Sequence, residues 1–297
     1  MITDIAGVAV GHWSDLRART GCTAVILPPG TVASGEIRGG APGTREWALL
    51  DPFRRVEHVD VVVLTGGSAF GLAACDGAVQ WCEERGRGVA TAAGAVPIVV
   101  GLVLYDLAVG DASVRPGAAE GRAACAAASS GPVGSGRIGA GTGATMAKLW
   151  GPERSRPGGL GNSVVRDGDV VVAALVAVNA VGDLRSAADG PDGGRGVPAL
   201  PPTAPPLLGA TTIGVVVTNA RVDKLGCHLM AQSGHDGMAR ALDPVHTAYD
   251  GDGLVVAATG AVDAELDRLR PLAAAAVEAA IRDAVRAGAE PVADERA

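Results

Sequence analysis

The chain has 297 residues, of which 48% are hydrophobic, and a formal net charge of −7. Its length and apolar content suffice for one large core, and we expect a single domain over 1–297. The negative charge and the lack of a basic run argue against nucleic acid or a membrane surface as partner. A small neutral or cationic ligand fits better.

The N-terminus and the cysteines predict a cytoplasmic protein. Residues 1–4 lack the basic and apolar regions of a signal peptide. Apolar stretches are interrupted well short of the roughly 20 residues that span a bilayer, so we expect no membrane helix. The five cysteines are widely spaced and include no CxxC pair, which argues against a disulfide framework or a zinc site. We expect buried free thiols, no metal and no cofactor.

The first half of the chain predicts two strands and two helices. Apolar, β-branched residues predict strands over 23–27 and 59–64. The pattern that follows predicts a helix over 69–85, with Ser68 as its cap. An alanine-dense helix is expected over 118–129. The first helix should pack on the sheet through four residues: Phe70, Ala74, Ala78 and Trp81.

The second half predicts a hairpin, a loop, two strands and a helix. Residues 164–178 predict a β-hairpin that turns at Asp167-Gly168-Asp169. The segment over 187–209 is rich in Pro, Gly and Asp and predicts an irregular surface loop. The remaining elements are strands over 213–218 and 254–258 and a helix over 261–287 that is divided near Pro271. Together they indicate mixed sheets covered by helices.

The boundary between the proline-rich stretch and the strand that follows is a candidate cleavage point. A stretch this rich in proline cannot form a helix or a central strand, and Thr211 begins the apolar run directly after it. Cleavage of the Ala210–Thr211 peptide bond would make Thr211 an N-terminus with a hydroxyl nucleophile and its own α-amino base. The products would be 1–210 and 211–297.

A glycine-rich segment over 139–148 could bring backbone N–H groups close to an anion or an oxyanion. A phosphate loop is not favoured, because Lys148 lacks the GK[ST] context. A Ser–His–Asp triad is not favoured either, since Gly66-Gly67-Ser68-Ala69-Phe70-Gly71 is one residue longer than a GxSxG elbow.

Two further polar sites adjoin apolar strands. Asn179 follows an apolar run, and its amide either caps a turn or donates a hydrogen bond to a developing oxyanion. Asp250 and Asp252 stand two residues apart in a glycine turn. They could converge on an ammonium group, or form an ordinary solvated turn. The EF-hand pattern is absent, so no metal is assigned.

In this order, the motifs resemble the DmpA/NylC family of self-cleaving hydrolases, which includes L-aminopeptidase/D-esterases, β-peptidyl aminopeptidases, nylon-oligomer hydrolases and a pantetheine hydrolase. The resemblance runs over nearly the entire chain. It rests on Ile2-Thr3-Asp4-Ile5-Ala6-Gly7-Val8, Val10-Gly11-His12, Arg38-Gly39-Gly40-Ala41-Pro42-Gly43-Thr44-Arg45-Glu46, Leu64-Thr65-Gly66-Gly67-Ser68-Ala69-Phe70-Gly71-Leu72, Gly139-Ala140-Gly141-Thr142-Gly143-Ala144-Thr145, Thr211-Thr212-Ile213-Gly214-Val215-Val216, His235-Asp236-Gly237 and Asp250-Gly251-Asp252.

The resemblance implies an α/β fold in the form of a four-layer α/β/β/α sandwich. It also implies cleavage before the nucleophile and assembly of the fragment pairs into larger homo-oligomers, such as a tetramer. Thr211 aligns with the family's nucleophile, and Lys148 and Asn179 align with residues at its active site. Asp250 and Asp252 align with acidic residues that support the nucleophile region. Substrate binding is expected at three residues of the glycine-rich segment: Gly141, Thr142 and Gly143.

The expected function is that of a self-processing threonine hydrolase, either an aminopeptidase or an amidohydrolase, acting on small amides or peptides. The freed α-amine, with a reference pKa of about 8, would serve as base to the Thr211 hydroxyl, with Lys148 tuning it. Asn179 would stabilise the oxyanion of an acyl-enzyme reaction by about 3 kcal/mol. Asp250 and Asp252 would hold the Lys148 and amine protons in place.

Two departures from the family pattern bear on specificity and processing. Ala210 stands where the nylon-hydrolase branch has Asn, which predicts slower or differently assisted self-cleavage. Ala140 stands where the aminopeptidase branch has an acidic residue that grips the substrate ammonium, which favours an endo-acting or small-amide hydrolase. Two alternatives stay open: an acyltransferase of the ornithine acetyltransferase type, and an uncleaved, non-catalytic binding protein on the same fold.

Overall fold

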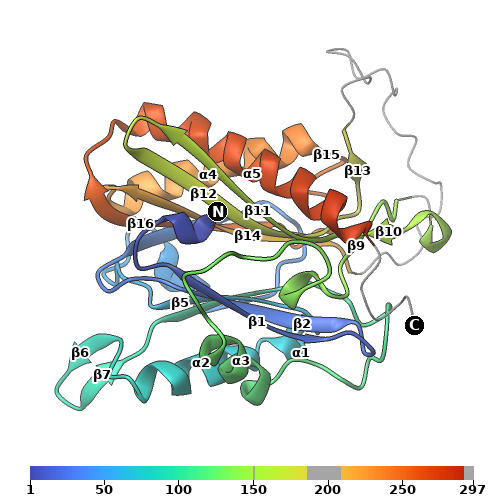
Figure 1. The fold of residues 1–297 in the computed structure, drawn as a ribbon, viewed down its shortest axis with the longest axis horizontal. Coiled ribbons are helices and arrows are strands. Elements are labelled where there is room, and N and C mark those ends of the chain that lie inside the picture. The colour runs from blue at the N-terminus through green and yellow to red at the C-terminus, as the bar shows by residue number, and fades with distance from the viewer. Residues whose placement is uncertain (150, 186–208, 291–297) are drawn as a thin grey trace.

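Two five-stranded sheets lie face to face, and each carries helices on its outer side (Figure 1). The computed structural model describes residues 1–149, 151–185 and 209–290. Of the irregular loop predicted over 187–209, all but Gly209 lies outside the described residues. The layers run α4 and α5, second sheet, first sheet, then α2 and α3. This arrangement confirms the expected α/β/β/α sandwich.

The first sheet has the strand order β1-β2-β5-β8-β4, and the second has the order β11-β12-β14-β16-β3. The strands of the first sheet are β1 (Ala9–Asp15), β2 (Thr20–Ile26), β5 (Val61–Thr65), β8 (Val99–Val103) and β4 (Thr44–Arg45). Those of the second are β11 (Gly159–Asp167), β12 (Val170–Asn179), β14 (Thr211–Ala220), β16 (Gly253–Val262) and β3 (Val32–Ile37). Three two-stranded ribbons complete the β structure: β6 (Val89–Thr91) with β7 (Gly94–Val96), β9 (Thr145–Met146) with β10 (Arg156–Pro157), and β13 (Asp183–Leu184) with β15 (Leu242–Asp243).

The helices differ in part from the predicted pattern. They are α1 (Ser68–Gly71), α2 (Ala74–Glu83), α3 (Ala118–Ala126), α4 (Lys224–Ala241) and α5 (Leu266–Gly288). The helix predicted over 69–85 is split into α1 and α2. Ser68 has a φ of +54° and makes no capping hydrogen bond, so its predicted role as a cap is wrong. Phe70 is 60% exposed and does not pack on the sheet, whereas Ala74 and Ala78 are buried as expected.

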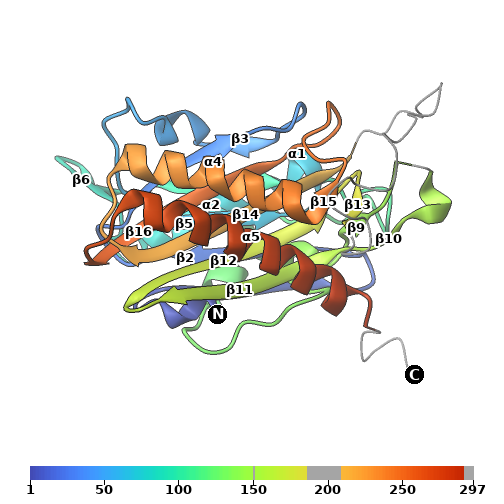
Figure 2. The ribbon, with the colours of Figure 1, turned by 90° about the horizontal axis from the view of Figure 1, so that it is seen from above.

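Helices α4 and α5 lie side by side over the second sheet (Figure 2). A Cβ atom on Gly237 would lie 2.2 Å from the Ala274 carbonyl oxygen, so glycine lets the two helices approach closely. Helix α5 continues through Pro271, and the predicted division there is wrong. Pro271 is exposed, so water can satisfy the carbonyl that loses its N–H partner.

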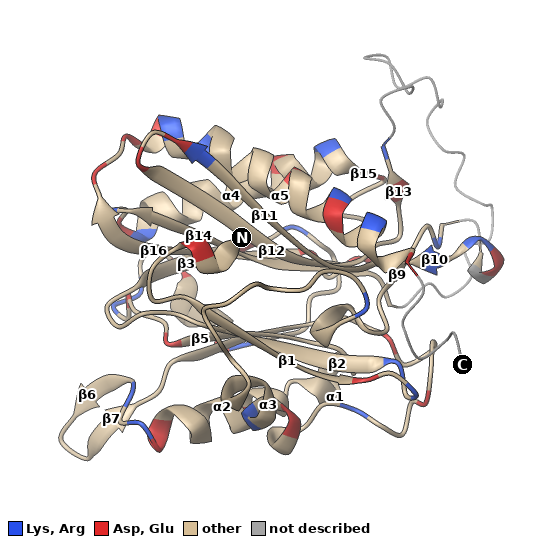
Figure 3. Cartoon of the chain, viewed as in Figure 1, with Lys and Arg blue, Asp and Glu red and all other residues tan. Residues whose placement is uncertain are grey.

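Because successive side chains of a strand point to opposite faces of the sheet, the buried apolar residues form two main cores. In β14, Ile213, Val215 and Val217 pack between the two sheets, whereas Val216 packs against the helices α4 and α5. Figure 3 shows acidic and basic residues interspersed on these helices and in loops, while most of each strand carries no charge. All five cysteines are buried free thiols, as predicted. None of the helices in the described part of the chain combines the length and apolar character needed to cross a membrane.

Lys224, at the start of α4, ties that helix to the loop after β4. Its side chain is 5% exposed, and Nζ donates hydrogen bonds to the backbone oxygens of Leu49 (2.6 Å), Arg54 (2.9 Å) and Val56 (2.7 Å). An ammonium group has three donors, so this site satisfies all of them. Lys224 therefore stabilises the contact between α4 and this loop.

Lys224→Met should lower the free energy of unfolding by about 2 kcal/mol, because three buried carbonyls lose a charged donor. Urea denaturation should be compared in a Thr211→Ala background, which is expected to remain one chain. Arg55→Met, on an exposed residue of the same loop, should change stability by less than about 0.5 kcal/mol. Equal effects of the two substitutions would contradict the stabilising role of Lys224.

Candidate active site

Strand register brings Thr211 and Asn179 together. Strands β12 and β14 are antiparallel, and Asn179 pairs directly with Thr211. Because alternate residues of a strand face opposite sides, Thr211 shares the side of Ile213, which packs between the two sheets. Asn179 likewise shares the side of Ala177. Both polar residues are buried, so the predicted nucleophile and oxyanion donor meet in the interior of the sandwich.

The Lys148 ammonium lies beside Asn179 and the segment before Thr211. Its Nζ donates to the Asn179 backbone oxygen (3.1 Å), to Asn179 Oδ1 (2.7 Å) and to the Gly209 backbone oxygen (2.9 Å). Burial lowers the pKa of Lys148 to about 7, although the charges of Asp250 and Asp106 oppose this shift. Three acceptors match the three N–H donors of the charged form, so the geometry favours the ammonium.

Five hydrogen bonds hold the amide of Asn179, the longest of them from the Thr145 hydroxyl to Oδ1 (3.5 Å). Its Oδ1 accepts from the Thr145 N–H (2.9 Å) and from Lys148 Nζ. Its Nδ2 donates to the backbone oxygens of Tyr105 (2.9 Å) and Gly209 (3.1 Å). Since a lysine can only donate, its position fixes which end of the amide carries oxygen. The Nδ2 group therefore points at the chain entering Thr211, and a turn cap is not its role.

Two hydrogen bonds hold the carbonyl of the Ala210–Thr211 bond. The Ala210 carbonyl oxygen accepts one from the Gly251 N–H (3.0 Å) and one from Thr211 Oγ1. Ala210 also forms an isolated parallel bridge with Asp250. The hydroxyl thus touches the carbonyl it would attack, and the Gly251 N–H lies where negative charge would develop.

Asp250 and Asp252 are buried and hold the backbone around Thr211. Asp250 Oδ1 accepts from the Val181 N–H (3.2 Å), and its Oδ2 accepts from the Thr247 N–H (3.0 Å) and hydroxyl (2.6 Å). Asp252 Oδ1 accepts from the Thr212 N–H (2.6 Å), and its Oδ2 from the backbone N–H (3.1 Å) and Nδ1 (2.8 Å) of His246. Burial, followed by the Asp252 charge, raises the pKa of Asp250 to about 6.

These contacts revise the expected role of the aspartate pair. Among the described residues, neither carboxylate hydrogen-bonds to Lys148 or to the Thr211 hydroxyl. Asp250 acts on Lys148 only through its charge, and Asp252 fixes the residue after the nucleophile. Within the described residues, no group of three or more His, Cys, Asp or Glu side chains could hold a metal ion. The pair therefore positions the backbone at Thr212, at the start of β14, and at Val181.

The glycine-rich segment packs against protein backbone. Gly141, Thr142 and Gly143 are buried, and the Thr142 hydroxyl donates to the Gly139 carbonyl (2.7 Å). A Cβ on Gly141 would lie 2.2 Å from the Leu160 nitrogen, and one on Gly143 would lie 1.8 Å from the Arg19 oxygen. The glycines are thus required for close packing. A role of these residues in substrate binding stays a prediction.

Sequence reasoning missed several residues of this site. Gly209 has a φ of +125°, and a Cβ there would lie 2.2 Å from Cδ1 of the Tyr105 ring. Buried Asp106 accepts from the Gly67 N–H (2.7 Å) and the Thr20 hydroxyl (2.7 Å) and contributes negative charge near Lys148. Gly251 donates to the Ala210 carbonyl through its backbone N–H, so the sequence carries no side-chain signal for this contact.

Gly251→Ala should slow self-cleavage about 100-fold. The added Cβ would lie 2.8 Å from Thr211 Oγ1 and 2.9 Å from the Ala41 oxygen, so the hydroxyl or the donating N–H must shift. The fraction of cleaved chain over time, read from denaturing gels, measures the effect. Gly134→Ala is the matched control, because its Cβ would meet only Ile138 Cδ1 at 3.5 Å. Cleavage of Gly251→Ala at the wild-type rate would contradict this placement.

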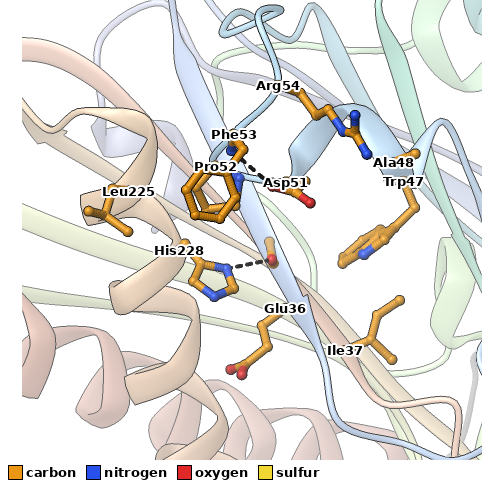
Figure 4. A pocket seen from close by; sticks show the side chains of 11 residues that line it. Glu36, Ile37, Trp47, Ala48, Asp51, Pro52, Phe53, Arg54, Leu225 and His228 are labelled. Carbon is orange, nitrogen blue, oxygen red and sulfur yellow. Dashed lines mark hydrogen bonds between the residues drawn. The ribbon is translucent and has the colours of Figure 1, made fainter.

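A separate hollow of about 550 Å³ lies between β3, α4 and the segment after β4. Figure 4 shows Trp47, Phe53, Leu225 and His228 around it, with the His228 ring bonded to the Gly35 carbonyl (3.0 Å). None of the predicted site residues lines this hollow. Thr211 and the predicted site residues around it therefore lie outside this hollow.

The amino-acid sequence matches a known peptidase family. The family model described as peptidase family S58 matches residues 1–296. The chain belongs to this family. An uncharacterized aminopeptidase of Mycobacterium leprae is 42% identical over 300 residues, covering 89% of this chain and 79% of the relative. A 6-aminohexanoate-oligomer endohydrolase of Kocuria sp. (strain KY2) is 32% identical over 280 residues, covering 88% of this chain and 75% of that enzyme.

Two solved structures of aminopeptidases share the fold. A beta-aminopeptidase of Burkholderia sp. superimposes with a TM-score of 0.72 and 25% identity, over 95% of this chain and 85% of that chain. The L-aminopeptidase D-Ala-esterase/amidase of Ochrobactrum anthropi, an Ntn hydrolase fold variant, superimposes with a TM-score of 0.75 and 22% identity, over 96% and 85%. The family match and these relatives make the S58 protein described here a hydrolase of peptide or amide bonds, as the sequence predicted.

Proposed function

We propose that the chain cleaves itself between Ala210 and Thr211, and that Thr211 then serves as the N-terminal nucleophile of a peptide or amide hydrolase. The observation that carries this proposal is the contact of the Thr211 hydroxyl with the Ala210 carbonyl, whose oxygen also accepts from the Gly251 N–H. A hydroxyl held against a carbonyl with a preplaced donor gains reactivity from orientation and from charge stabilisation.

Self-cleavage would proceed in two steps, an acyl shift from nitrogen to oxygen and then hydrolysis of the ester. Thr211 Oγ1 forms a bond to the Ala210 carbonyl carbon, the C–N bond breaks, and the hydroxyl proton passes to the Thr211 nitrogen. The product is an ester with a free α-amine. Water then adds to the ester carbonyl and releases the Ala210 carboxylate and the Thr211 hydroxyl. During both steps the Gly251 N–H would donate to the oxyanion.

In turnover, the same atoms would act on a substrate. The freed amine takes the hydroxyl proton while Thr211 attacks the substrate carbonyl, and the leaving amine receives a proton as the acyl-enzyme forms. The Gly251 N–H would donate to the oxyanion, Asn179 Nδ2 would donate to the carbonyl one residue before it, and Lys148 supplies positive charge. The peptidase family match supports water, rather than another acyl acceptor, as the group that completes the reaction.

The two fragments would stay together after cleavage. The fragment 211–297 contributes β14 and β16, which lie between β12 and β3 of the fragment 1–210. Separation would expose both buried faces of this sheet. We propose that these pairs assemble further into a homo-oligomer and work in the cytoplasm on small amides or peptides. The five buried free thiols agree with a reducing compartment.

Hydroxylamine tests the ester step. In the slowed Gly251→Ala variant, neutral hydroxylamine should accelerate chain cleavage and convert the new C-terminus at Ala210 to a hydroxamate, seen by mass spectrometry. The same treatment of Thr211→Ala should leave the chain intact. Cleavage of Gly251→Ala that hydroxylamine does not accelerate, with only the carboxylic acid at Ala210, would count against an ester intermediate.

A further inference from the structure

The uncleaved chain shows how the site holds the acyl side of a bond about to be cut. Gly209 and Ala210 precede the scissile bond and lie where the acyl part of a substrate would lie. Each makes contacts that belong to the site and not to its own strand. These contacts describe the acyl groups that the processed enzyme accepts.

The Gly209 carbonyl occupies a position with two donors. Lys148 Nζ lies 2.9 Å from its oxygen, and Asn179 Nδ2 lies 3.1 Å from it. When cleavage releases this segment, Lys148 and Asn179 each lose one of their acceptors. A lost hydrogen bond inside the protein is costly, so a ligand carbonyl at the same place is favoured. In a substrate, this carbonyl is the one that acylates the amine of the residue being cut.

The Ala210 methyl group occupies a small apolar pocket. Ala210 is buried, and its neighbours Leu149 and Val181 are buried with it as a separate hydrophobic cluster. Because these side chains are packed against one another, a side chain much larger than methyl would have to displace Leu149 or Val181. Beyond it, the Tyr105 ring lies so close to Gly209 that an added Cβ would approach Cδ1 to 2.2 Å. The acyl side therefore fits a slender chain.

We propose that the processed enzyme cuts inside chains, at a small, N-acylated residue, and discriminates against substrates with a free amine at that residue. Resting on the proposed function, this inference names the substrate class of the same site. A free-amine substrate has no carbonyl to offer Lys148 and Asn179. Its ammonium would replace the Ala210 N–H, one bond from that carbonyl carbon, and would lie close to the positive charge of Lys148. Leu149 and Val181 set the size limit.

The test compares three p-nitroanilides on wild-type protein whose complete cleavage has been verified by mass. They are acetyl-Ala, free-amine Ala and acetyl-Leu p-nitroanilide. The kcat/KM for acetyl-Ala should exceed that for free-amine Ala at least about 100-fold, as expected when a site loses a hydrogen-bond acceptor. It should exceed that for acetyl-Leu about 10-fold or more.

Pocket variants add a second measurement. Leu149→Ala should raise the ratio of acetyl-Leu to acetyl-Ala hydrolysis at least about 10-fold. Leu272→Ala, which removes a partly buried leucine on α5 outside the cluster, should leave the ratio unchanged. An unchanged ratio in Leu149→Ala would refute the pocket.

The outcomes distinguish a failure of the N-acyl preference from a failure of the proposed hydrolase function. Faster hydrolysis of free-amine Ala by the processed enzyme would overturn the N-acyl preference while leaving the Thr211 hydrolase intact. If the processed protein cleaves none of the three anilides and Thr211 is not acylated by them, the proposed function fails, and the inference that rests on it fails too.

Discussion

Thr211→Ala should abolish both self-cleavage and hydrolysis, whereas Thr211→Ser should retain both. Alanine removes the oxygen that contacts the Ala210 carbonyl, and no other hydroxyl among the described residues hydrogen-bonds to that carbonyl. Serine keeps the oxygen on the same Cβ. Intact mass after a fixed incubation measures cleavage, and anilide hydrolysis measures turnover.

Thr212 provides a matched control for this experiment. It is fully buried, and within the described part of the chain its hydroxyl has no hydrogen-bond partner. Its backbone N–H, which donates to Asp252, survives any side-chain change. Thr212→Val, which keeps the shape of the side chain, should therefore cleave like the wild type. If Thr211→Ala is cleaved while Thr212→Val is not, the nucleophile is assigned to the wrong threonine.

Lys148→Met should slow self-cleavage and turnover by at least about 100-fold. Methionine nearly preserves the length of the side chain but removes the three donors to Asn179 and Gly209. Without them the Asn179 amide loses its fixed orientation, and the segment entering Thr211 loses one of the two side-chain donors on its Gly209 carbonyl. Cleavage time courses and anilide kinetics give the two readouts.

The chain contains one other lysine, Lys224, which serves as the control for the Lys148→Met experiment. Lys224 also donates three hydrogen bonds to oxygens, but at the start of α4 and away from Thr211. Lys224→Met should therefore lower stability without slowing cleavage. If both substitutions slow cleavage equally at a temperature where both proteins are folded, the effect of Lys148 is structural and its place in the mechanism is lost.

Residue type and strand ends allowed much of the site to be predicted from the sequence. Thr211 and Asn179 each stand at the end of an apolar strand, so their positions along the chain were visible, and strand pairing then placed them together. Lys148 is one of two lysines in the chain, and the family resemblance assigned it to the site. Its partners could not be predicted, because they depend on the path of Gly209 and on the exact register of β12 with β14.

Other features left weak signals in the sequence. Helix α4 contains glycines at 226, 234 and 237, which lower its helical propensity, and its need for them arises only from contacts with neighbouring elements such as α5. The aspartate pair was expected to hold protons near Lys148. The structure shows its oxygens occupied by backbone N–H groups, the Thr247 hydroxyl and His246, which no local pattern encodes. The Gly251 donor belongs to the backbone and has no side-chain signature.

The intact mass of the purified wild-type protein under denaturing conditions, with N-terminal sequencing of any fragment, tests the central claim most directly. We predict two species that match 1–210 and 211–297, with Thr-Thr-Ile-Gly at the new N-terminus, which elute together under native conditions. A full-length chain that persists after long incubation would contradict self-cleavage at Thr211. It would support instead an uncleaved binding protein on this fold.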